Sequence, residues 1–122
     1  MWQMYNPNPK GARVGDCSVR AISKAVDQDW IETYIGICVM GLAKADMPSS
    51  NSVWGEYLRE RGFSKMIPEP GTTLKEFCSK YPKDIYVAAL NGHVVTVKDG
   101  DYFDTWDSGD ETVLYCWRKE TI

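Results

Sequence analysis

The sequence has only one histidine and no closely spaced pair of cysteines. Its four cysteines are Cys17, Cys38, Cys78 and Cys116. A zinc site commonly holds two of its ligands in one tight loop, so we expect no metal site, and we expect no other cofactor. Disulfides are not expected either, because they belong to secreted proteins and the chain has no recognisable secretion signal.

The chain also lacks an excess of positive charge and any long apolar run. It carries 14 Lys and Arg against 17 Asp and Glu, a formal net charge of −3, so binding to nucleic acid is not expected. No apolar segment approaches the roughly 20 residues of a membrane span. Residues 1–7 lack the charged-then-apolar pattern of a signal peptide. We therefore expect a cytoplasmic protein with reduced thiols and no membrane partner.

The composition that is present is that of an ordinary globular protein. The 122 residues are 43% hydrophobic, which suits one domain over residues 1–122. Helices are expected at about 17–26, from 30 to before 47, at 53–61 and at 74–81. In the second helix, the residues expected to form the buried face are Ile31, Tyr34, Ile35, Cys38 and Leu42.

The pattern changes after residue 82, where short apolar segments alternate with turn signals. The strands expected from this pattern lie at 85–90, 93–97, 102–106 and 112–117, after a short extended piece at 63–67. Asn91-Gly92 and Asp99-Gly100 are typical of hairpin turns. The sequence thus predicts an α+β fold. Its N-terminal helices, within about residues 1–82, pack on a C-terminal antiparallel sheet of about four strands, within about 83–122.

One cysteine stands apart because it follows Gly15 and Asp16 at the start of the first helix. The Asp16 side chain is expected to cap this helix by accepting its first backbone N–H groups. Cys17 then lies at the positive end of the helix dipole, which favours the thiolate and makes the sulfur nucleophilic. The alternative is that Cys17 is a small apolar residue of the core, which is the commoner role of cysteine.

The single histidine, His93, is expected to open a strand directly after a turn. In the hairpin formed with the next strand, Val95 lies opposite Asp104, so His93 and Asp104 share a face as diagonal neighbours. A carboxylate in this place fixes the tautomer of the imidazole and stabilises its charged form. A register shift of one residue brings Asp107 opposite His93, so Asp107 remains the alternative partner. Both contacts are also compatible with a purely structural role.

The order of these residues resembles that of papain-like cysteine peptidases, and in particular the compact bacterial C39-like peptidases, which cleave leader peptides after a double glycine. The matching segments are Gly15-Asp16-Cys17, Asn91-Gly92-His93-Val94-Val95 and Tyr102-Phe103-Asp104. The resemblance implies a papain-like fold with Cys17 as the nucleophile, His93 as general base and acid, and Asp104 as the residue that orients the histidine. It also implies a peptide or protein substrate.

Two positions depart from the pattern of that family. Gly11 stands where such enzymes usually have a glutamine that donates to the oxyanion, and Ser18 follows the cysteine. We expect Asn8, or alternatively Asn6, to reach in from the entry loop as a donor, together with the backbone N–H of Cys17.

The sequence therefore predicts a thiol-dependent hydrolase that acts on a peptide or amide bond through a Cys-His-Asp triad and an acyl-enzyme. One alternative is a catalytically silent interaction module or inhibitor on the same scaffold. Another is a deamidase or transamidase that uses the same triad, because the acyl-enzyme is shared and only the acceptor differs. The oligomeric state is left open by the sequence.

Overall fold

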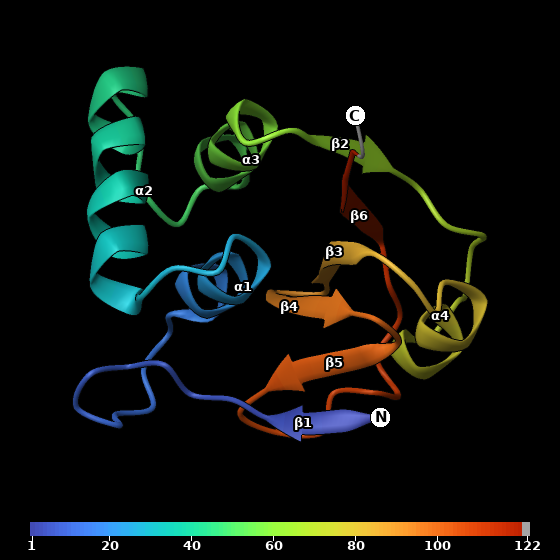
Figure 1. The fold of residues 1–122 in the computed structure, drawn as a ribbon. Helices are drawn as coiled ribbons and strands as arrows, with labels where there is room; N and C mark the ends of the chain where they lie inside the picture. The colour runs from blue at the N-terminus through green and yellow to red at the C-terminus, as the bar shows by residue number, and fades with distance from the viewer. Residues whose placement is uncertain (121–122) are drawn as a thin grey trace.

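The structure of the chain, a computed structural model, describes residues 1–120, so residues 121 and 122 of the predicted sheet region lie outside it. Over the described residues the chain forms an α+β fold of four helices and one six-stranded sheet (Figure 1). The helices are α1 (Cys17–Ala25), α2 (Trp30–Lys44), α3 (Asn51–Glu60) and α4 (Leu74–Lys80). The strands are β1 (Trp2–Met4), β2 (Phe63–Met66), β3 (Ile85–Leu90), β4 (His93–Lys98), β5 (Asp101–Asp104) and β6 (Tyr115–Lys119).

The sheet is mixed and larger than the four antiparallel strands that were predicted. Its strand order is β1-β5-β4-β3-β6-β2. Strand β1 runs parallel to β5, and all the other neighbours are antiparallel. The prediction was wrong about β1 because a strand of three residues shows no alternation that identifies it, and β1 forms only by pairing with the edge of β5.

The predicted division into a helical part at about 1–82 and a sheet part at about 83–122 is also wrong. Strands β1 and β2 belong to the same sheet as β3 to β6, and α4 follows β2, so the helices are interleaved with strands. The extended piece expected at 63–67 is β2, which pairs with β6. Local capping signals identified the starts of α2 and α4 correctly. The Asp29 side chain accepts from the N–H of Glu32, and Thr73 and Glu76 form a capping box at α4.

The sheet separates two apolar clusters. Helices α1, α2 and α3 lie on one side of it and α4 lies on the other (Figure 1). Along β3, Val87 and Ala89 belong to the cluster of the first side, whereas Tyr86, Ala88 and Leu90 belong to the cluster that includes α4. This alternation is the period of two of a β-strand. Because both faces are covered, β3 has an uninterrupted apolar sequence.

Helix α2 buries a different face from the one predicted. Its buried residues are Thr33, Ile37 and Gly41. Of the residues predicted to be buried, Ile31, Tyr34, Ile35 and Leu42 are exposed and Cys38 is half-buried. The reason is close helix packing, because Gly36 lies so near the Tyr57 ring of α3 that an added Cβ would come within 2.7 Å of it. Within residues 1–120, no helix has the length and apolar character needed to cross a membrane.

The hairpin of β4 and β5 has the predicted register. Thr96 pairs with Phe103, as in the alignment that makes His93 and Asp104 diagonal neighbours. The turn at residues 99–100 has positive φ angles of 50° and 81°, the conformation that tight hairpin turns require. Because His93 is the first residue of β4 and Asp104 is the last of β5, the hairpin brings both to the same end of the sheet.

Candidate active site

Helix α1 begins at a groove, and Cys17 is its first residue. The groove has a volume of about 470 Å³ and is formed by the starts of α1 and α3, the β3–β4 turn and the start of β6. Cys17 is half-buried, and His93 lines the same groove. A larger hollow of about 650 Å³ near residues 82–85 is lined by neither cysteine nor histidine, and another of about 580 Å³ is lined by Cys78 without a histidine. Of these three hollows, the groove is the one that brings a cysteine and a histidine together.

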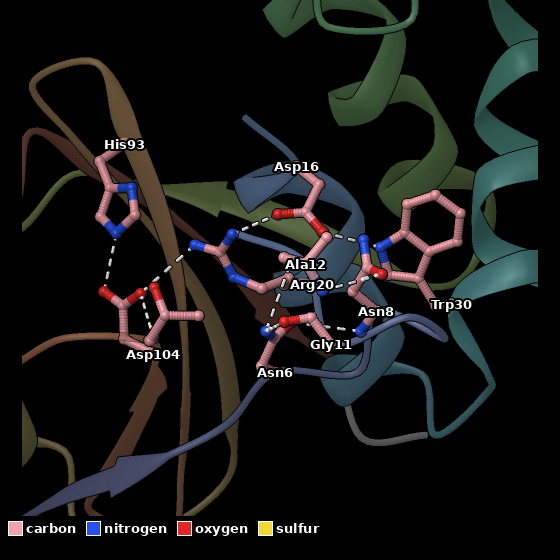
Figure 2. A network of polar contacts seen from close by, with 10 residues as sticks. Asn6, Asn8, Gly11, Ala12, Asp16, Arg20, Trp30, His93 and Asp104 are labelled. Atoms are coloured by element: carbon pink, nitrogen blue, oxygen red, sulfur yellow. Dashed lines mark hydrogen bonds and ion pairs between the residues drawn. The ribbon is translucent and has the colours of Figure 1, made fainter. Parts of the chain in front are cut away.

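A buried carboxylate holds the ring of His93. The ring atom Nε2 lies 2.7 Å from Oδ2 of Asp104 (Figure 2), and only 1% of the surface of Asp104 is exposed. This contact leaves the other ring nitrogen, Nδ1, for the thiol of Cys17. Asp107, the alternative partner considered from the sequence, accepts a hydrogen bond from the hydroxyl of Tyr102 instead.

The ionisation of Cys17 and that of His93 depend on each other. Burial raises the pKa of the Cys17 thiol, but hydrogen bonding and charge interaction with His93 outweigh it, so the pKa lies below that of an ordinary thiol. Burial lowers the pKa of His93, whereas its contacts with Asp104 and Cys17 raise it, to a net value of about 9. A lowered thiol pKa beside a raised imidazole pKa favours a thiolate–imidazolium pair at neutral pH.

Four donors surround the carboxylate of Asp104. Besides His93, the Ser108 hydroxyl donates to Oδ2 at 2.6 Å and the Thr105 backbone N–H donates to Oδ1 at 2.8 Å. The fourth donor is Nη2 of Arg20, 3.4 Å from Oδ1. Burial raises the pKa of Asp104, but the hydrogen bonds and the charge of the imidazolium lower it below its ordinary value. The carboxylate is therefore ionised at neutral pH and fixed in orientation.

Asp16 does not cap α1 in the way that the sequence predicted. It occupies the N-cap position without a side-chain hydrogen bond to the helix. One carboxylate oxygen accepts from the guanidinium of Arg20, and the other accepts from the indole N–H of Trp30 at 2.8 Å (Figure 2). The prediction was wrong because Arg20 is buried and requires an anion beside it, and the Asp16 carboxylate is that anion and so does not turn to the helix N–H groups. The side chain of Asp16 thus leaves the first backbone N–H groups of α1 uncapped, and Cys17 and Ser18, the first two residues of that helix, line the groove.

The entry loop does not bring the predicted oxyanion donors into the groove. Oδ1 of Asn8 accepts from the backbone N–H groups of Lys10, at 2.9 Å, and Ala12, at 3.3 Å. The side-chain amide of Asn6 donates to two carbonyl groups of the same loop (Figure 2). Both asparagines shape the loop, and neither lines the groove. Of the residues predicted to supply donors, Cys17 is the one that lines the groove.

Three residues of the site were not identified from the sequence. Arg20 and Ser108 contact the carboxylate, and Trp106 packs against the ring of His93, with ring centroids 5.3 Å apart. One signal was available, because Arg20 follows Asp16 by four residues, the spacing of an ion pair on a helix. A second signal was the register of the β4–β5 hairpin, which places Trp106 opposite His93. Ser108 carried none, since its contact depends on the path of the chain after β5.

Among residues 1–120, no three or more His, Cys, Asp or Glu side chains are grouped so that they could hold a metal ion. Comparisons with protein-family models, with curated proteins and with solved structures found no match to this chain. The functional argument therefore depends on the residues of the groove and their geometry.

Proposed function

We propose that this protein is a thiol-dependent hydrolase that acts on a peptide or amide bond and forms an acyl-enzyme on Cys17. The observation that carries the proposal is the convergence of three residues from separate elements. Cys17 starts α1 and lines the groove together with His93, whose Nε2 lies 2.7 Å from Asp104. A nucleophile beside a base that a third group orients is the recurring arrangement of covalent catalysis. The same arrangement supports the resemblance to the papain-like fold.

The first step transfers the acyl group to the sulfur. The thiolate of Cys17 attacks the carbonyl carbon, and the negative charge moves to the carbonyl oxygen, where the backbone N–H of Cys17 donates to it. His93 then gives its proton to the leaving nitrogen, the C–N bond breaks and an amine departs. Asp104 supports this step because it holds the ring in one orientation and stabilises the imidazolium.

The second step releases the acyl group and restores the site. His93, now neutral, takes a proton from a water molecule, and the resulting hydroxide attacks the thioester carbon. The C–S bond breaks, a carboxylic acid leaves, and the thiolate–imidazolium pair forms again. An amine in place of water gives transamidation, and a glutamine side chain as the acyl donor gives deamidation, so these reactions are variants of the same site.

A catalytically silent interaction module is the competing proposal. This competing proposal would be favoured if Cys17 were buried without access to a groove. Cys17 instead is half-buried and lines a groove of about 470 Å³, and its pKa is lowered, which supports the catalytic proposal.

The test uses p-nitrophenyl acetate, an activated ester that acylates nucleophilic thiols. We expect a burst of one equivalent of nitrophenolate per protein and an acetyl group on the peptide that contains Cys17, detected by mass spectrometry. The matched controls are Cys17→Ala, which should remove the burst, and Cys38→Ala, which should keep it. A burst that persists in Cys17→Ala, or no acylation of Cys17 at all, contradicts the proposal.

A further inference from the structure

Arg20 is a buried cation between two buried carboxylates. Only 6% of its surface is exposed. Nη1 contacts Oδ1 of Asp16, and Nη2 lies 3.4 Å from Oδ1 of Asp104 (Figure 2). Removing a guanidinium from water is costly unless its partners are well placed, and the planar fork of arginine can contact two carboxylates at once. The arrangement therefore links the start of α1 to the end of β5.

This link spans the two halves of the proposed catalytic site. The other donors to Asp104 come from the sheet or from the turn that follows β5, namely His93, Thr105 and Ser108. Of the four donors to that carboxylate, Arg20 is the one that comes from α1, the helix that carries the nucleophile. Arg20 is thus positioned to fix the carboxylate relative to the helix.

We propose that Arg20 is a positioning residue of the thiol site, which acts through Asp104 and Asp16 to hold the ring of His93 toward Cys17. This inference rests on the proposed function. The guanidinium of Arg20 donates to the two carboxylates, so its positioning effect passes through them, whereas its charge also acts on the thiol directly. It keeps the carboxylate of Asp104 in place behind the ring, and it holds the carboxylate of Asp16 away from the first N–H groups of α1.

The positive charge of Arg20 favours the thiolate of Cys17, as its positioning of the His93 ring does. It is among the groups that lower the pKa of the Cys17 thiol. It also balances one of two buried carboxylates, which would otherwise repel each other and favour protonation of one of them. A methionine at this position would fill a similar volume but would leave Asp16 and Asp104 without their shared cation.

The experiment compares three variants with a matched control. Arg20→Met removes the link, Arg20→Lys keeps the charge without the two-armed contact, and Asp16→Asn weakens the anchor of Arg20 but leaves an acceptor for Trp30. The control is Arg59→Met, which removes an arginine of α3 that is exposed and paired with Glu56. Two properties are measured for each protein: the pH profile of Cys17 alkylation by iodoacetamide, followed by peptide mapping, and the midpoint of urea unfolding.

We expect Arg20→Met to slow alkylation of Cys17 at pH 6 by about tenfold, the effect of raising the thiol pKa by one unit. The acid limb of the profile should move to higher pH. Arg20→Lys and Asp16→Asn should give smaller shifts in the same direction, and Arg59→Met should give none. The single histidine offers a second readout, since the proton on its Nε2 should lose its protection from exchange in the NMR spectrum of Arg20→Met.

Each outcome decides the inference. Folded Arg20 variants with lower stability but an unchanged pH profile and an unchanged His93 proton overturn it, because Arg20 is then structural only. If Arg20→Met does not fold, Arg20→Lys and Asp16→Asn decide by the same two readouts. If Cys17 of the unaltered protein reacts no faster than a free thiol, the proposed function itself fails, which is distinct from a reactive Cys17 that ignores Arg20.

Discussion

The sheet separates cysteine thiols whose pKa values are shifted in opposite directions. On the side of α4, Cys78 and Cys116 lie in an apolar cluster, and burial raises the pKa of these thiols to about 11 and about 12. At the start of α1, burial acts on Cys17 as well, yet its pKa is lowered because His93 and Arg20 are close. Loss of solvent alone therefore makes a thiol inert, and charged neighbours are what make it reactive.

The largest expected effect comes from removing the cation beside Cys17. In His93→Ala, the thiol keeps its burial but loses the imidazolium, so Cys17 should come to resemble the inert cysteines. We expect the rate of acylation by p-nitrophenyl acetate to fall roughly 10²- to 10⁴-fold, the usual contribution of a general base. Stopped-flow measurement of the burst at pH 7 tests this. A variant that folds and keeps the rate of the unaltered protein would contradict the explanation that charged neighbours distinguish Cys17 from the inert cysteines on the side of α4.

Substitution of the carboxylate should have the next largest effect. Asp104→Asn keeps the volume of the side chain but removes the charge that stabilises the imidazolium, so the burst rate should fall about 10²-fold. Asp107→Asn is the matched control, since Asp107 contacts Tyr102 and not the ring, and its rate should match the unaltered protein. Equal losses in both variants, or a loss in Asp107→Asn alone, would show that Asp104 was assigned to His93 wrongly.

The other side of the sheet should respond in stability and not in reactivity. Phe77 is fully buried in the cluster of α4, so Phe77→Ala should lower the free energy of unfolding by about 3–5 kcal/mol. In the protein that remains folded, the pH profile of Cys17 alkylation should be unchanged. Urea unfolding and alkylation of the same samples measure both properties. A shifted profile would mean that the two sides of the sheet are linked.

The smallest expected effect is the pH dependence of stability. Because the pKa of His93 is raised to about 9 in the folded protein, its contribution to stability is complete below about pH 6.5, the unfolded value, and is lost as the pH rises through 9. The lowered thiol pKa of Cys17 acts in the opposite direction, so the comparison is made in a Cys17→Ala background. There, the stability advantage of the protein with His93 over the protein with His93→Ala should shrink between pH 6 and pH 10, because Asp104 still raises the pKa of the ring. Urea unfolding at several pH values measures it, and a constant or growing advantage would contradict the raised pKa.

The features that the sequence predicted are those with local causes. The capping box of Thr73 and Glu76 starts α4 as expected, because both partners lie within one turn of the helix. The turn at residues 99–100 sets the register of β4 and β5, and that register makes neighbours of His93 and Asp104. A short hairpin carries such information over only a few residues, so it can be inferred without the rest of the fold.

The features that were missed depend on distant contacts. Strand β1 forms because it pairs with the edge of β5, and the buried face of α2 depends on how closely Gly36 approaches Tyr57. Asp16 has the sequence of a helix cap, but Arg20 and Trp30 take its two oxygens. Except for the pair of Asp16 and Arg20, whose spacing of four residues is visible in the sequence, these contacts join segments that lie apart in the chain, and no local pattern reports them.

The most direct test of the account compares three cysteines of one protein in one experiment. The folded protein is treated with iodoacetamide at pH 6, with N-acetylcysteine as the free-thiol reference, and the modified peptides are quantified over time. We predict that Cys17 reacts faster than the reference and that Cys78 and Cys116 react far more slowly. Cys17 should also lose its advantage in His93→Ala. Alkylation of Cys17 at or below the rate of the free thiol would contradict the account.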